Sequence, residues 1–325
     1  MKRIICLTAA LLLCLCLASC AHETETEANT APVVVGFSQL GAESSWRIAN
    51  TVNMEEAAKE AGYGLMMENA NQKQEKQIDA IRSFIAYQVD VIVFSPIVEN
   101  GWDNVLNEAK SAGIPVIIMD RMIETDDESL YTAYIGADFY AEGRRAGEYL
   151  IRKADAMNAE HLNIVEISGT IDSTPMRYRQ KGFMETIGGD SRFTVIDSIS
   201  GDFLRSKGEE CAAELIEKHG KEAIDVIYAH NDAMMLGTLD VIEREGIVPG
   251  KDIILITVDG EKEAVDALKE GRINCVVQCT PNLGKSVMEL VRMIINGEDI
   301  PKICHPEESM FTEFDDLTDP AVEGF

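Results

Sequence analysis

Four short apolar runs of this sequence each end in polar residues that could hydrogen-bond a ligand. The runs and the residues that follow them are 91–94 with Ser95, 116–119 with Asp120 and Arg121, 226–229 with His230, Asn231 and Asp232, and 253–258 with Asp259. Apolar runs without alternation are typical of strands buried on both faces of a parallel sheet, and the ligands of such sheets bind beyond the carboxyl ends of the strands. Two such sheets facing each other would direct these groups into one cleft, which suits a small polar molecule.

The elements that must position these residues form a repeated alternation of strands and helices. The expected strands are 33–37, 91–94, 116–119, 164–167, 195–199, 226–229 and 253–258, and the helices of the second half lie near 177–187, 205–218, 233–245 and 261–270. This alternation predicts an α/β fold. The body of the chain is too long for one hydrophobic core, so we expect two similar Rossmann-like lobes, each a parallel sheet flanked by helices.

The beginning of the chain predicts export. Lys2 and Arg3 precede an apolar run over 4–17, and Ala18, Ser19 and Cys20 follow it. A basic start, a short apolar core and small residues before a cleavage point describe a secretory signal. The ending resembles a bacterial lipobox, which makes 1–19 a lipoprotein signal peptide and Cys20 the lipid-bearing residue. The alternative is an ordinary signal peptide in which Cys20 is incidental.

Composition limits the partners of the exported chain. Residues 20–32 have no apolar period and are expected to form a flexible tether. The formal net charge is −27, and it becomes about −29 when the basic signal peptide leaves. Nucleic acids and anionic membrane surfaces need basic patches, so we expect neither as a partner, and the lipid anchor is the only expected membrane contact.

The cysteines of the body and the missing enzyme signatures narrow the chemistry further. Cys211, Cys275, Cys279 and Cys304 are expected to be mostly buried, with a disulfide possible after export. They include no short CxxC pair for a zinc site. The chain has neither a GxGxxG after 33–37 nor a GxxxxGK[ST] motif. His230 beside Asp232 could serve as a general base, but no nucleophile accompanies the two residues. We expect no enzyme, no cofactor and no metal.

Several longer stretches carry a resemblance to a known family. They are 36–39 with 43–47, 72–75, 101–102, 201–208 and 229–232. On these stretches the chain, from residue 33 almost to its end, resembles the type I periplasmic sugar-binding proteins, the family of the ribose- and galactose-binding proteins. Within that family it resembles the galactofuranose-binding branch.

The resemblance implies a function and one alternative that uses the same cleft. It implies a monomeric, lipid-anchored solute-binding protein outside the cytoplasm, at the cell surface or in the periplasm, which delivers a sugar, expected to be a hexose, to the permease of an ABC importer. A receptor that presents sugar to a membrane sensor kinase or chemoreceptor would use the same cleft. Sugar-responsive transcription regulators share the fold, but they carry a DNA-binding headpiece where this chain has its export signal.

The resemblance also implies which residues bind the sugar. The positions that match the family are Asp120, Arg121, Arg179, Asn231 and Asp259. A carboxylate accepts hydrogen bonds from hydroxyls, a guanidinium donates them, and an amide does both. Arg177, two residues before Arg179, is the less favoured neighbour.

The first lobe supplies the residues that distinguish the branch, namely Glu43, Trp46 and Arg47. The indole of Trp46 could cover the C–H face of a sugar ring, although tryptophan is otherwise most often a core residue. Glu43 could accept from a hydroxyl or cap the helix that follows it.

The remaining expected contacts are Phe203, Ser95 and Gln278. Phe203 matches an aromatic residue that packs on the ligand from the second lobe. Ser95 is a substitution at a position that contacts a hydroxyl, and Gln278 stands where the galactofuranose branch tends to carry an acidic residue. As in the family, the lobes are expected to comprise 33–137 plus 280–306 and 138–279 plus 307–325. They would be joined by three crossovers and would close on the ligand by a hinge motion.

Overall fold

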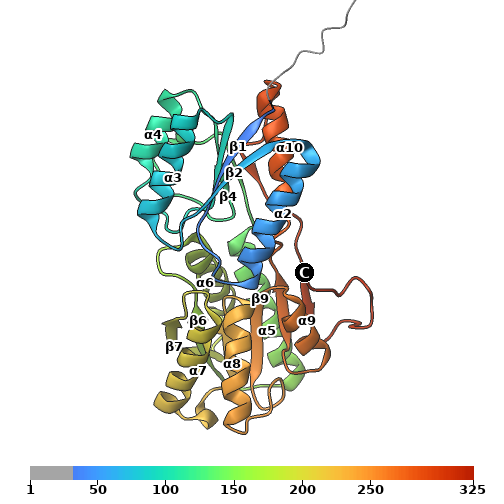
Figure 1. Cartoon of the computed structure of the whole chain (residues 1–325). Helices are drawn as coiled ribbons and strands as arrows, with labels where there is room; N and C mark the ends of the chain where they lie inside the picture. The colour runs from blue at the N-terminus through green and yellow to red at the C-terminus, as the bar shows by residue number, and fades with distance from the viewer. Residues whose placement is uncertain (1–31) are drawn as a thin grey trace, which may run out of the picture. The chain divides into compact units, whose positions relative to one another are not determined.

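The computed structural model describes residues 32–325, and residues 33–325 form one unit that contains two six-stranded sheets. Figure 1 shows the two sheets with their covering helices. The expected signal peptide, Cys20 and all of the expected tether except Pro32 lie outside the described residues. Among the described helices, none combines the length and the apolar character needed to cross a membrane.

The first sheet has the strand order β11-β5-β4-β3-β1-β2, and all its neighbouring strands are parallel. The strands are β1 (Val34–Gln39), β2 (Gly64–Asn69), β3 (Val91–Phe94), β4 (Val116–Met119), β5 (Ala133–Ile135) and β11 (Ile303–Cys304). Helices α3 (Gln74–Tyr87) and α4 (Asp103–Ser111) cover one face, and α2 (Ser45–Ala61) and α10 (Gly284–Ile295) cover the other (Figure 1). A short 3-10 turn, Glu128–Leu130, precedes β5.

The second sheet has the strand order β12-β10-β9-β8-β6-β7, with only β12 antiparallel to its neighbour. The strands are β6 (Leu162–Ser168), β7 (Phe193–Ser200), β8 (Val226–Ala229), β9 (Ile254–Asp259), β10 (Cys275–Gln278) and β12 (Met310–Thr312). Helices α5 (Phe139–Met157) and α6 (Thr174–Ile187) pack on one face. Helices α7 (Arg205–His219), α8 (Asp232–Arg244) and α9 (Lys262–Lys269) pack on the other.

Burial of the central strands explains why this sequence forms covered parallel sheets. Every residue of β3, β4, β8 and β9 is buried, whereas the edge strand β2 is half-buried to exposed. Apolar side chains on both faces of a strand can leave water only if helices cover both faces. The predicted fold class, two α/β lobes with parallel sheets flanked by helices, is confirmed.

The chain passes from one sheet to the other between β5 and α5, between β10 and α10, and between β11 and β12. The predicted lobe boundaries, at 137/138, 279/280 and 306/307, fall in these passages and remain a proposal. For simplicity, lobe 1 denotes the part built on the first sheet and lobe 2 the part built on the second.

The expected strands at 91–94, 116–119 and 226–229 have the bounds of β3, β4 and β8, and the other expected strands differ by one or two residues at each end. The expected helices coincide with α6 to α9 within three residues. Cys211, Cys275, Cys279 and Cys304 are all free thiols, of which only Cys304 is not buried.

Candidate functional site

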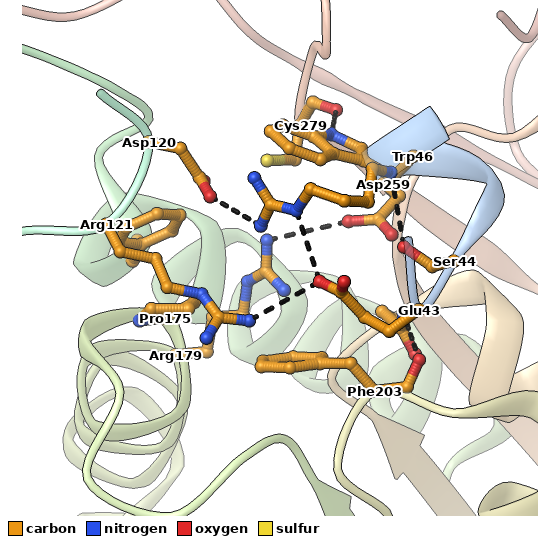
Figure 2. Close-up of a pocket in the computed structure, with 13 residues that line it drawn as sticks. Glu43, Ser44, Trp46, Asp120, Arg121, Pro175, Arg179, Phe203, Asp259 and Cys279 are labelled. Carbon is orange, nitrogen blue, oxygen red and sulfur yellow. Dashed lines mark hydrogen bonds and ion pairs between the residues drawn. The ribbon is translucent and has the colours of Figure 1, made fainter. Parts of the chain in front are cut away.

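A pocket lies between the two lobes, at the carboxyl ends of strands from both sheets (Figure 2). Asp120 follows β4 directly, Asp259 is the last residue of β9, and Cys279 follows β10. The residues that line the pocket are Glu43, Ser44, Trp46, Arg47, Asp120, Arg121, Phe139, Pro175, Arg179, Phe203, Asn231, Asp259 and Cys279. The pocket therefore sits where parallel sheets place their ligands.

Arg47 organises the polar wall that lobe 1 contributes. Its Nη2 lies 2.7 Å from Oδ2 of Asp120, and its Nε lies 3.1 Å from Oε1 of Glu43. Nη1 of Arg47 donates to Oγ of Ser95 at 3.3 Å, and Ser95 donates to Asp120 at 3.1 Å. Ser95 is fully buried behind Asp120 and does not line the pocket. Its role in this structure is to hold Arg47 and Asp120 in place.

Two buried polar atoms of this wall have no hydrogen-bond partner among the described residues. They are Oε2 of Glu43 and Nε of Arg121, and the side chains of both residues are about as buried as a core residue. Ser44 caps α2, because its hydroxyl accepts from the backbone N–H of Arg47 at 3.3 Å. Glu43 therefore does not cap this helix. Buried polar groups are almost always paired. One free acceptor and one free donor in the same pocket favour a polar ligand.

The arginine side chains in lobe 1 are held close together. Burial is the main reason why the pKa of Arg121 falls to about 10, and repulsion from Arg47 adds to it, while the carboxylate of Glu43 opposes the shift. Arg121 also donates from Nη1 to the carbonyl of Ile97 at 3.0 Å. At neutral pH both guanidinium groups carry their charge and can donate to an oxygen-rich ligand.

Arg179 organises the wall that lobe 2 contributes. Its Nε pairs with Oε2 of Glu142 at 2.7 Å, and its Nη2 lies 3.6 Å from Oδ1 of Asp259. Its Nη1 donates to the carbonyl of His230. Burial lowers the pKa of Arg179, but the nearby Glu142, with Cys279 and Asp259, more than offsets it, so the pKa is raised well above its ordinary value.

Asp259 is a buried carboxyl in an environment that disfavours its charge. Burial raises its pKa well above the ordinary value, the attraction of Arg179 opposes this, and Asp232 and Glu261 raise it further.

Asn231 caps α8, since its side-chain oxygen accepts from the backbone N–H of Met234 at 3.0 Å, and its amide donates to the carbonyl of Phe203 at 3.3 Å.

Aromatic rings close the pocket on both sides. Trp46 is 5% exposed, and its indole N–H donates to the carbonyl of Cys279 at 2.7 Å, which ties α2 of lobe 1 to the end of β10 in lobe 2. The guanidinium of Arg121 lies 5.2 Å from the ring centroid of Phe203, and that of Arg179 lies 5.4 Å from the ring centroid of Phe139. Flat apolar faces beside hydrogen-bonding groups suit a ring that carries hydroxyls.

Three pocket residues have an unusual backbone conformation. The φ angles of Asp120, Phe203 and Asp259 are +64°, +62° and +130°, although none of these residues is glycine. Such conformations cost of order 1–3 kcal/mol each and concentrate at ligand-binding sites. The fold therefore accepts local strain where these side chains enter the pocket.

Direct contacts join the lobes outside the pocket. The backbone N–H of Glu99 donates to the carbonyl of Asp172 at 3.1 Å, and that of Met122 donates to the hydroxyl of Thr174 at 3.0 Å. Arg177 forms an ion pair with Glu99 and does not line the pocket. It therefore contacts the other lobe at the edge of the cleft, whereas Arg179 points into the pocket.

Gln278 and His230 are the other predicted polar residues that the structure places outside the pocket. Gln278 accepts from the backbone N–H of Ser309 at 3.2 Å and lines a neighbouring cavity that shares Asp259 with the pocket. His230 is fully buried, with Nε2 2.9 Å from Oε1 of Glu166. Its ring faces the core of lobe 2, so it is not placed to act as a base in the pocket.

Sequence reasoning missed four lining residues. Phe139 is the first residue of α5, Pro175 lies in the first turn of α6, and Cys279 follows β10. Ser44 caps α2. Apart from the capping pattern of Ser44, which the sequence carries, these residues reach the pocket through the way the two lobes meet. No local pattern encodes that.

Comparisons with known proteins agree with this geometry. The sequence profile of the periplasmic binding protein domain matches residues 35–299. The chain belongs to the periplasmic binding protein family. The predicted resemblance to its sugar-binding members, and among them to the galactofuranose-binding branch, is confirmed. All residues that line the pocket of this periplasmic binding protein lie inside the matched range.

Three similar proteins illustrate the branch. The galactofuranose-binding protein YtfQ of Escherichia coli K12 is 42% identical over 258 residues, which cover 79% of this chain and 80% of that protein. A crystal structure from Mycobacterium smegmatis in complex with β-D-fucofuranose is 43% identical, with a TM-score of 0.83 over 86% of this chain and 91% of the other. The binding protein of the arabinose ABC transporter from Shewanella sp. ANA-3, bound to α- and β-L-arabinofuranose, is 37% identical. Its TM-score is 0.83 over 86% of this chain and 92% of the other.

Proposed function

We propose that this protein binds one sugar in the pocket between its lobes and delivers it to an ABC importer. The observation that carries the proposal is the convergence of buried hydrogen-bonding groups from both lobes on one pocket with aromatic walls. Asp120 and Arg121 enter from lobe 1, and Arg179, Asn231 and Asp259 enter from lobe 2. A ligand that contacts both sets favours the closed arrangement of the lobes, because only that arrangement satisfies all of its hydroxyls.

A neutral sugar fits the charges of the pocket better than an ionic ligand. Arg47 already pairs with both Asp120 and Glu43, and Arg179 pairs with Glu142. Paired charges offer both donors and acceptors, which hydroxyl groups need, without leaving a large net charge for a ligand to neutralise. Similarity to proteins named for galactofuranose, fucofuranose and arabinofuranose supports a furanose-form sugar, with a hexose as the first candidate.

Isothermal titration calorimetry tests this proposal. The panel should contain galactose, a methyl galactofuranoside, a methyl galactopyranoside, arabinose, ribose and an amino acid. We expect the galactofuranoside to bind at least as tightly as free galactose, which contains little furanose, and the locked pyranoside to bind much more weakly. Preference for the pyranoside or the amino acid would contradict the proposed ligand class.

Delivery to an importer requires that the protein lie outside the cytoplasm, and we propose that a lipid on Cys20 anchors it to the membrane there. The Leu17-Ala18-Ser19-Cys20 order supports lipid attachment at this cysteine. In cells, Cys20→Ala should release the protein from the membrane fraction or leave the precursor uncleaved. If the Cys20→Ala precursor is cleaved normally and the protein stays in the membrane fraction, Cys20 is not the lipid anchor.

The importer role is favoured over the sensor role. The relative from Shewanella is named as a component of an ABC transporter, which supports delivery to a permease. Co-purification of the anchored protein with an ABC permease, in the presence of the sugar, would support the proposal, and co-purification with a sensor kinase would replace it.

A further inference from the structure

Three side chains with metal-binding atoms meet at the edge of the pocket, where the lobes are joined, and one of them, Cys279, also lines it. One ligand atom each of Glu142, Cys279 and Glu308 lies within 4.8 Å of the other two. Glu142 is in the first turn of α5, Cys279 follows β10, and Glu308 lies between β11 and β12. Cys279 and Glu308 therefore lie in two of the stretches in which the chain passes between the sheets, and Glu142 lies one helical turn after the third.

A second observation points to a ligand at this cluster. The side chain of Glu142 is fully buried, its Oε2 is taken by Arg179, and its Oε1 has no hydrogen-bond partner among the described residues. Glu308 accepts from the backbone N–H of Thr280 at 2.8 Å through Oε1, and no lysine or arginine between residues 32 and 325 lies within ion-pair distance of it. A buried, unpaired carboxylate oxygen is costly unless something binds it.

We propose that Glu142, Cys279 and Glu308 form a binding site for a divalent transition-metal cation such as Zn²⁺. One thiolate and two carboxylates are ligands that zinc accepts, with metal–sulfur and metal–oxygen distances of about 2.3 and 2.0–2.2 Å. The three ligand atoms must then approach one another by roughly 1 Å from their widest separation, which side-chain rotations can supply. Ca²⁺ and Mg²⁺ prefer all-oxygen sites and should bind weakly.

Acidic groups outnumber basic groups around the cluster. Glu142, Glu308 and Asp259 supply three carboxyl groups, and Arg179 and Arg145 supply two guanidinium groups. Nη1 of Arg145 is itself buried without a hydrogen-bond partner among the described residues. This excess of acidic groups favours a cation over an anion at the cluster.

The cluster also has a route to solvent. Glu308 lines the cavity that contains Gln278, and so do Asp259, Glu307 and Glu323. These carboxylates would attract a cation toward the buried ligands. Because Cys279 and Glu308 lie in two of the passages between the lobes and Glu142 lies at the start of α5, a bound cation would link these three stretches of chain. Cys279 also lines the sugar pocket, so metal binding is measured on the protein without sugar.

Calorimetry on the chelator-treated protein tests the site with Zn²⁺, Cd²⁺ and Ca²⁺, and ultraviolet absorbance follows thiolate bonding to Cd²⁺. We expect saturable binding of one Zn²⁺ and one Cd²⁺ per protein, a thiolate-to-cadmium absorption band, and no saturable binding of Ca²⁺ in the same concentration range. Glu308→Gln keeps the hydrogen bond to Thr280, since an amide oxygen also accepts. It should weaken Zn²⁺ binding by at least about tenfold.

Two control variants separate the cluster from its surroundings. Glu307→Gln changes an exposed neighbour that lines the same cavity, and Cys211→Ser removes a buried thiol in another part of lobe 2. Both should keep Zn²⁺ affinity and the cadmium band, whereas Cys279→Ser should lose the band. Zn²⁺ binding that is absent, or that Glu308→Gln leaves unchanged, would overturn the proposal, even if Cys279→Ser fails to fold.

Discussion

Replacing Asp259 by asparagine should change stability and sugar affinity in opposite directions. Asp259 is 5% exposed, and Arg179, at 3.6 Å, is the only cation within ion-pair distance of it among the described residues. Burial raises its pKa well above the ordinary value, Arg179 opposes the shift, and Asp232 and Glu261 add to it. The folded protein therefore disfavours the ionised carboxyl, and asparagine, which is neutral and similar in shape, removes this cost.

The two effects have different sizes. Removing an unfavourable buried charge should raise the unfolding free energy of the protein without sugar by about 0.5–2 kcal/mol at pH 7, or by a few degrees in Tm. The gain should shrink as the pH falls to about 4, close to the ordinary carboxyl pKa, because the unfolded state then also takes up the proton. Replacing one carboxyl oxygen by an amide nitrogen removes an acceptor for sugar hydroxyls, which should cost about 1.5–3 kcal/mol of binding free energy, or roughly 10- to 150-fold in Kd.

Urea unfolding at pH 4 and pH 7, followed by tryptophan fluorescence, measures the first effect, and calorimetry with the preferred sugar measures the second. Asp240→Asn is the matched control, because Asp240 is exposed on α8 and far from the pocket lining. It should leave both quantities unchanged. If Asp259→Asn destabilises the protein without sugar at pH 7, or keeps the wild-type affinity, the reasoning about this carboxyl is refuted.

Three further predictions follow from the same geometry. Trp46→Ala should weaken every sugar by roughly tenfold or more in calorimetry, since face stacking is indifferent to hydroxyl stereochemistry, and Trp46→Phe should restore part of the loss. Gln278→Glu should change the affinity for the preferred sugar by less than about tenfold, or roughly 1.4 kcal/mol, because Gln278 lies outside the pocket; a larger change would place it in the site. Burial, with the carboxylate of Glu261, raises the pKa of Asp232 to about 8. Wild-type unfolding free energy should therefore fall as pH rises from about 4 to 8, because the folded state holds a proton that the unfolded state has lost. Asp232→Asn should flatten this slope, and an unchanged slope would mean that another group causes it.

The sequence predicts the centre of this fold better than its margins. The strands β3, β4, β8 and β9 are continuous apolar runs, and burial on both faces explains that pattern. The edge strand β2 is partly exposed, and β5, β11 and β12 have three residues or fewer. Such short or exposed strands form because a neighbouring strand offers its hydrogen bonds, so their own sequences carry little signal.

The same division holds for the candidate site. Asp120, Asn231 and Asp259 could be predicted because they follow buried strands, and the structure brings them to one pocket with all the other predicted residues except Ser95 and Gln278. Resemblance to a family, rather than any local pattern, indicated Arg179 and Phe203. Phe139 and Cys279 could not be found from the sequence, because they reach the pocket only where the chain passes between the lobes.

The most direct test of the central claim is a crystal structure of the protein with the sugar that calorimetry selects. We predict one sugar ring between Trp46 and Phe203, with hydroxyl groups within hydrogen-bond distance of Asp120 and Arg121 from lobe 1 and of Asn231 and Asp259 from lobe 2. A sugar bound outside this pocket, or in contact with the polar groups of one lobe alone, would contradict the account.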